Sequence, residues 1–251
     1  MAMKSPTLRI CALYPDLMNI YADRGNLLVL ERRCAWRGIG FELAGSSLGQ
    51  PLDGAAHDLY YIGGGQDRDQ RLCAEDLHEH KGQALREAAA RGAVVLGVCG
   101  GYQLLGDSYV LDGDTLTGVG LFRARTVREP GPRLIGNVAI ELSLEGLAGK
   151  RVLAGFENHG GRTCLEPGAE PLGRVLKGHG NDGRSGYEGA RAGNAIGTYL
   201  HGPLLPKNAW FADWLIATAL GIGPDELAPL DDELERQAHQ SARRAAGLAA
   251  A

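Results

Sequence analysis

AVVLGVCGGYQLL, residues 93–105, contains the clearest structural signal in the chain. The first half of this segment is a continuous apolar run rich in β-branched residues, which predicts a strand buried on both faces. The run stops at Cys99, where two glycines permit a tight turn before Tyr102 begins a predicted helix. Cys99 is therefore expected at a strand-to-helix elbow with its sulfur directed outward, the geometry of an activated nucleophile. The N–H groups and the dipole at the helix start are expected to favour the thiolate.

Predicted strands and helices alternate through the first half of the chain. The apolar patterns predict strands at residues 7–13, 39–43, 58–62 and 93–98, and helices at residues 26–36 and 69–91. Gly82 is a weak point inside the second segment, so one broken helix or two short helices are expected there. This alternation indicates an α/β fold with a mostly parallel central sheet flanked by helices.

The second half of the chain favours antiparallel strands. Asp112-Gly113 predicts a hairpin turn, and further strands are expected at residues 121–127, 133–142, 152–156 and 194–200. Residues 177–188 are polar and rich in glycine, which predicts a surface loop close to the site or to a partner. A helix is expected over residues 206–220. We expect one domain, residues 1–222, followed by a helical C-terminal tail, residues 223–251.

The composition restricts the classes of function. A net charge of -4 and a pI near 6.0, with no block of Lys or Arg, argue against a nucleic-acid partner. Five scattered cysteines without a C-x-x-C pair argue against a disulfide framework and against a metal site, and they fit a reducing cytoplasm. Residues 1–6 lack the apolar core of a signal peptide, and no run is long enough for a transmembrane segment. We therefore expect a cytoplasmic protein.

His201 is the strongest of seven histidines for the base that a thiol enzyme needs. It follows the predicted strand 194–200, and sites in an open α/β sheet assemble at the carboxyl ends of strands. His159 also follows a predicted strand, but its glycine-rich surroundings equally suit a structural support. Gly63-Gly64-Gly65 comes directly after a buried strand and offers backbone N–H groups, which with the N–H of Gly100 could form an oxyanion hole.

Three segments together resemble the class I (triad-type) glutamine amidotransferases, and the resemblance covers nearly the whole chain. These segments are GGGQD at 63–67, GVCGGYQ at 97–103 and YLHG at 199–202. Within that superfamily the chain looks like the cobyric-acid-synthase-like branch, and specifically like the glutaminase subunits of lipid II isoglutaminyl synthase. The segments that point there are GGQDR at 64–68, GFENHGGRT at 155–163, YPDLMNIY at 14–21 and DRGN at 23–26. The resemblance implies a flavodoxin-like fold.

The resemblance also implies a reaction and a role for each site residue. Cys99 would attack the side-chain amide of L-glutamine, His201 would shuttle the proton, and water would release glutamate from a γ-glutamyl thioester. Gly64 or Gly65 would serve the oxyanion together with Gly100. Arg133 is the candidate for holding the substrate carboxylate, because its guanidinium fork is bidentate, and Gln103 is a second candidate for substrate binding.

One position departs from the pattern of the superfamily. Many class I members place a glutamate two residues after the catalytic histidine, whereas this chain has Pro203 there. The carboxylate that orients the imidazole must therefore come from Glu188 or from a synthetase partner. A partner-supplied carboxylate would make the lone chain a weak glutaminase, because an unoriented imidazole samples the wrong tautomer.

The chain has no G-x-x-x-x-G-K-[ST] motif for ATP, so no cofactor is expected in it. Amidation of a carboxylate needs activation, so ATP and Mg²⁺ are expected in a separate synthetase. The resemblance implies a heterodimer with a MurT-like, Mur-ligase-family subunit that amidates the D-glutamate of the lipid II stem peptide to D-isoglutamine. Lipid II would then be reached through the partner, at the inner face of the membrane.

Three alternatives remain at this point. The chain could serve a cobyric-acid-type ligase, although such ligases usually carry their ATP-binding domain in the same polypeptide. It could be a stand-alone γ-glutamyl thiol hydrolase that needs no partner. It could also be a non-catalytic binding module, in which Cys99 is a small buried hydrophobic residue.

Overall fold

The computed structural model describes residues 5–20 and 23–249. The described residues leave out residues 1–4, which begin the region without a signal-peptide core, and Tyr21, which ends the family-like segment 14–21. Within the described ranges, no helix combines the length and the apolar character needed to cross a membrane.

A six-stranded sheet forms the centre of the molecule, in the order β13-β14-β4-β3-β1-β2. All neighbours in this sheet are parallel except β13 and β14. The strands are β1 (Thr7–Leu13), β2 (Gly40–Ser46), β3 (Leu59–Ile62), β4 (Val94–Val98), β13 (Ala190–Ala192) and β14 (Ala195–Thr198). The predicted α/β fold with a mostly parallel central sheet is thereby confirmed.

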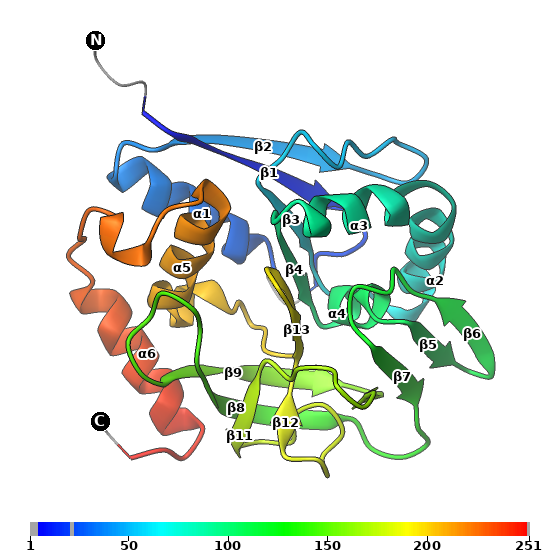
Figure 1. Cartoon of the computed structure of the whole chain (residues 1–251). Helices are drawn as coiled ribbons and strands as arrows, with labels where there is room; N and C mark the ends of the chain where they lie inside the picture. Colours follow the sequence, from blue (N-terminus) through cyan, green and yellow to red (C-terminus); the bar gives the residue numbers. More distant parts are fainter. Residues whose placement is uncertain (1–4, 21–22, 250–251) are drawn as a thin grey trace.

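Helices cover both faces of this sheet (Figure 1). On one face lie α1 (Arg24–Trp36) and α5 (Ala209–Leu220), and on the other α2 (Asp67–Asp76), α3 (Gly82–Ala90) and α4 (Gly100–Leu105). Every residue of β4 is buried, as expected for a central strand covered on both sides. The sheet and its helices thus hold the elbow after β4 in a rigid frame.

The helical segment predicted at 69–91 as one broken or two short helices consists of α2 and α3, joined without a gap by the π-helical turn η1 (Leu77–Lys81). Lys81 is fully buried, pairs with Asp76 and lies over the ring of Tyr14. The irregularity therefore precedes Gly82 and coincides with a buried ion pair.

Two smaller sheets carry most of the strands expected in the second half of the chain. The strand expected at 194–200 among the antiparallel strands is instead β14, which lies in the central sheet and pairs parallel with β4. One has the order β10-β7-β5-β6 and the other β12-β11-β8-β9. The hairpin at Asp112-Gly113 is confirmed, and both residues have the positive φ that its turn requires. The strands are β5 (Ser108–Leu111), β6 (Asp114–Thr117), β7 (Ala124–Arg128), β8 (Leu134–Leu142), β9 (Arg151–His159), β10 (Gly161–Leu165), β11 (Gly173–Lys177) and β12 (Tyr187–Glu188).

The C-terminal segment packs against α1 and α5. The helix expected from Pro206 begins as the 3₁₀ turn η2 (Leu205–Lys207) and continues as α5. It is followed by η3 (Pro224–Glu226) and α6 (Glu233–Ala245). The buried Arg33 of α1 pairs with Asp213 of α5 and with Asp232 just before α6. The boundary at residue 222 stays a prediction.

Candidate active site

Cys99 lies at the expected elbow between β4 and α4. Its φ of 52° and ψ of -105° belong to a strained region that non-glycine residues rarely occupy, and such strain is typical of a nucleophile elbow. The main-chain N–H of Cys99 donates to Thr198 O of β14 (2.8 Å), and that of Gly101 donates to Gly63 O (3.0 Å). These bonds to both neighbouring strands hold the elbow in place. The Cys99 side chain is 5% exposed.

His201 follows β14 at the same edge of the sheet. The register pairs Thr198 with Val98, so β14 and β4 end side by side. The main chain of His201 pairs with Phe156 of β9, with N–H to O distances of 2.9 and 3.2 Å. The main-chain N–H of Asn158 donates to His201 Nε2 (3.1 Å). The imidazole is therefore anchored on β9, a strand of another sheet.

The ionisation of the two side chains differs from that of free residues. Burial raises the pKa of Cys99 to about 12, and the charge of Asp23 acts in the same direction, while that of Arg133 opposes it. The expectation of a favoured thiolate is therefore wrong for the isolated chain, because burial outweighs the short helix. Burial also lowers the pKa of His201 to about 4, helped by His159 and by the positive charge of Arg133. The chain alone holds a neutral thiol and a neutral imidazole.

The glycines after β3 differ in what their N–H groups contact. Gly64 N–H donates to Oδ2 of the buried Asp23 (2.6 Å), so this donor is engaged. Gly65 lies against the elbow, since a Cβ built on Gly100 would lie 2.9 Å from Gly65 N. The side chain of Gln70 holds Gly65 in place by donating to its carbonyl (3.0 Å). The structure thus brings Gly65 and Gly100 together, whereas the N–H of Gly64 is bound to a carboxylate.

Arg133 and Gln103, the two predicted substrate-binding residues, have different surroundings. Arg133 is exposed, and its guanidinium donates to the side chain and to the main chain of Asn158. Its positive charge lowers the pKa of Cys99 and of His201. Gln103 is buried and donates from Nε2 to the hydroxyl of Tyr199 (3.2 Å). The role of both residues in binding glutamine stays a prediction.

Glu188 and His159 also lie near His201, each with partners of its own. The buried carboxyl group of Glu188 accepts from Thr198 Oγ1 (3.0 Å) and from the Tyr199 N–H (2.6 Å), and burial raises its pKa to about 8. Glu188 thereby braces the end of β14. His159 stacks on Tyr199 with ring centroids 3.6 Å apart and donates from Nδ1 to a carbonyl, which suits a structural support.

Three residues at this edge escaped the sequence analysis. Asp23 is buried, engages Gly64, and has a pKa raised by burial to about 7. Glu157 accepts the N–H groups of His179 (2.6 Å) and Gly180 (2.9 Å), so it ties the glycine-rich loop to β9. Asn158 contacts both His201 and an arginine. Asp23, Glu157 and Asn158 lie inside the segments that resemble the family. That position is the only feature of the sequence that could have indicated them as site residues.

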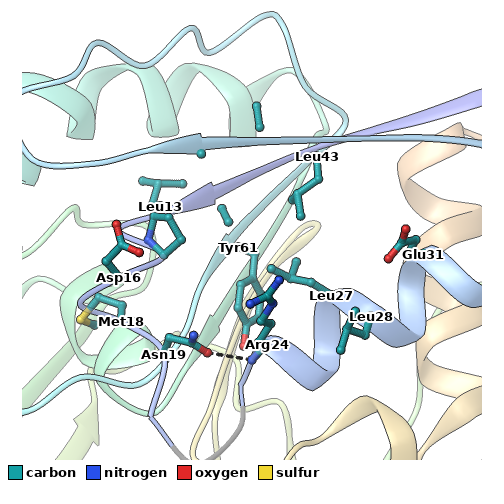
Figure 2. Close-up of a pocket in the computed structure, with 14 residues that line it drawn as sticks. Leu13, Asp16, Met18, Asn19, Arg24, Leu27, Leu28, Glu31, Leu43 and Tyr61 are labelled. Carbon is teal, nitrogen blue, oxygen red and sulfur yellow. Dashed lines mark hydrogen bonds between the residues drawn. The ribbon is translucent and has the colours of Figure 1, made fainter.

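A cavity of about 440 Å³ opens near the ends of β1 and β2, beside α1 (Figure 2). Met18 and Asn19 come from the segment after β1, and Asn19 Oδ1 accepts the main-chain N–H of Arg24 (2.9 Å). Cys99 and His201 are not among the residues that line this cavity. The cavity is therefore separate from the candidate catalytic pair.

Comparisons with known proteins agree with this geometry. Residues 9–209 match the CobB/CobQ-like glutamine amidotransferase domain. The structure resembles PurLQS from Thermotoga maritima with a TM-score of 0.59 and 20% sequence identity, covering 87% of this chain and 96% of that one. That likeness confirms the fold alone.

Relatives with similar sequences show to which branch of this family the chain belongs. The chain is 38% identical to the GatD subunit of lipid II isoglutaminyl synthase from Staphylococcus aureus, over 93% of both chains. It is 37% identical to the GatD subunit from Streptococcus pneumoniae, over 85% of this chain and 80% of that one. Cobyric acid synthase of Chlorobaculum tepidum matches over 45% of this chain and 23% of its own length. The chain therefore belongs to the CobB/CobQ-like glutamine amidotransferases and, within them, to the family of GatD subunits.

Proposed function

We propose that the chain is the glutaminase subunit of a lipid II isoglutaminyl synthase. It hydrolyses L-glutamine and delivers ammonia to a MurT-like ATP-dependent ligase, which amidates the D-glutamate of the lipid II stem peptide to D-isoglutamine. The similarity to GatD subunits over 93% of both chains supports this assignment. The observation that carries the chemistry is the strained Cys99 at the end of β4, beside the strand that leads to His201.

The reaction proceeds through a thioester on Cys99. The sulfur attacks the side-chain amide carbon of glutamine, and the N–H groups of Gly65 and Gly100 stabilise the oxyanion. His201 takes the thiol proton and passes it to the leaving nitrogen, which departs as ammonia. Water then attacks the thioester, and its proton returns through His201 to the sulfur as glutamate leaves. Arg133 holds the α-carboxylate of the substrate.

A partner completes this site. Both carboxyl oxygens of Glu188 are engaged by Thr198, and one also accepts the Tyr199 N–H, so this group braces β14. We therefore favour a carboxylate from the synthetase as the group that orients His201. Such a carboxylate would raise the pKa of His201 from its low value and make the imidazole a stronger base. Glutamine would then be hydrolysed only in the complex with the synthetase, so ammonia would be released only where the synthetase can use it.

The other components of the proposed complex lie outside this chain. ATP and Mg²⁺ bind to the synthetase, and the two subunits form a heterodimer. The complex works in the cytoplasm at the inner face of the membrane, where the lipid II substrate is reached through the partner.

Isotope transfer tests the proposed function. The chain is mixed with its Mur-ligase-like partner, lipid II, ATP, Mg²⁺ and glutamine labelled with ¹⁵N in the side-chain amide. We expect ¹⁵N in the D-isoglutamine of the product. Cys99→Ser should abolish this transfer but leave amidation from added ammonium intact. Hydrolysis of γ-glutamyl peptides at full rate without a partner would instead identify a thiol hydrolase.

A further inference from the structure

Asn158 stands between the two side chains that the proposed reaction needs at opposite ends of glutamine. It is a half-buried residue of β9. Its Oδ1 accepts from Nε of Arg133 (2.6 Å), and its main-chain O accepts from Nη2 of the same residue (2.7 Å). Its main-chain N–H donates to Nε2 of His201 (3.1 Å). One residue thus contacts both the predicted carboxylate-binding group and the predicted base.

The edge of β9 explains this arrangement. Main-chain N–H groups of a strand that point to the same edge alternate with a period of two residues. Phe156 uses its N–H and its O to pair with the main chain of His201. Two residues along, the N–H of Asn158 faces the same edge and meets the imidazole. The strand therefore fixes the backbone and the ring of His201 relative to Asn158.

The guanidinium of Arg133 is held by one of its two forks. Nε and Nη2 form the side fork, and both donate to Asn158. Nη1 donates to no residue in the described part of the chain. The terminal fork, formed by Nη1 and Nη2, therefore has N–H groups that can donate to a ligand. A carboxylate accepts such a fork bidentately. Arg133 is exposed, so a ligand can reach it.

We propose that Asn158 is a positioning residue that sets the substrate class of the site, by aiming the terminal fork of Arg133 at a free α-carboxylate at a fixed distance from His201. The inference rests on the proposed function. It implies that the site selects free L-glutamine and rejects glutamine whose α-carboxylate is blocked. Without the side chain of Asn158, Arg133 keeps its bond to the main chain but loses the bond that fixes the orientation of its guanidinium.

The test compares two substrates in the assembled complex. L-glutamine has the free carboxylate, and L-glutaminamide carries an uncharged amide in its place. Asn158→Ala should raise the KM for glutamine about tenfold or more, as expected for a lost hydrogen bond to a charged group, with kcat nearly unchanged. Its kcat/KM for glutaminamide should not change. In an Arg133→Ala background the same substitution should have no further effect, because the two residues act as a unit.

Controls separate positioning from folding and from the proposed function itself. Asn137→Ala removes a matched exposed asparagine of the neighbouring strand, whose side chain donates to Ala245 O, and should leave both substrates unaffected. Asn158→Ser shortens the acceptor and should act in the same direction as Asn158→Ala. An equal loss for glutamine and glutaminamide, or an unchanged KM, would overturn the inference. A wild-type complex unable to hydrolyse glutamine would instead overturn the proposed function.

Discussion

Asp23→Asn should make Cys99 of the isolated chain more reactive towards iodoacetamide. Burial, together with the charge of Asp23, raises the pKa of the thiol from an ordinary 9.0 to about 12. Each pKa unit changes the thiolate population tenfold, so at a given pH the thiolate of Cys99 is about a thousandfold scarcer than that of a free thiol. Removing the carboxylate leaves burial in place, so we expect partial recovery, on the order of tenfold, above the pKa of Asp23 near 7.

The assay follows alkylation of Cys99 by peptide mass mapping between pH 6 and pH 10. Cys164→Ser provides the background, because Cys164 is the exposed free cysteine. The rate in the otherwise unchanged chain should rise about tenfold per pH unit without levelling off. Asp23→Asn should lie above it at pH 8 and higher, with the two rates converging towards pH 6 as Asp23 becomes protonated. A plateau below pH 9, or no effect of Asp23→Asn, would refute the reasoning.

Three further outcomes follow from the contacts described above. Gly100→Ala places a methyl group 2.9 Å from Gly65 N and should lower glutaminase activity of the complex about a hundredfold, measured as glutamate release, with iodoacetamide still reaching Cys99. Asp213→Ala leaves the buried Arg33 with Asp232 alone and should lower the free energy of unfolding by about 3 kcal/mol in urea titrations; an unchanged midpoint would show that this ion cluster contributes little. The pKa of Glu188 is about 8 in the folded chain and 4.5 ordinarily, so the folded state binds more protons between these values. The contribution of Glu188 to stability is therefore present below pH 4.5 and lost as pH rises to 8. Over this pH range the urea midpoint of Glu188→Gln should fall less than that of the unchanged chain.

The elbow and the mostly parallel character of the central sheet were predictable because their signals are local. A β-branched run followed by two glycines determines its own conformation, and the alternation of strands and helices leaves few arrangements for the sheet. The same holds for Asp112-Gly113, whose turn chemistry is contained in two residues. Confirmed features of this kind depend on neighbours in the sequence.

The electrostatics of the site depend on residues far apart in the sequence. The N–H of Gly64 is bound by Asp23, which lies 41 positions earlier, and no pattern in either segment indicates that pairing. The raised pKa of Cys99 reflects its burial, which a short helix start cannot offset. Asn158 likewise meets His201 only because β9 lies beside the segment that follows β14.

The most direct test of the account is the site at which a glutamine-like affinity label reacts. The chain is treated with 6-diazo-5-oxo-L-norleucine, alone and in complex with the synthetase, and the labelled peptides are mapped. We predict a covalent adduct on Cys99 alone, formed much faster in the complex and prevented by excess L-glutamine. Labelling of another cysteine, or no labelling of Cys99 in a complex that hydrolyses glutamine, would contradict the assignment of Cys99 as the nucleophile.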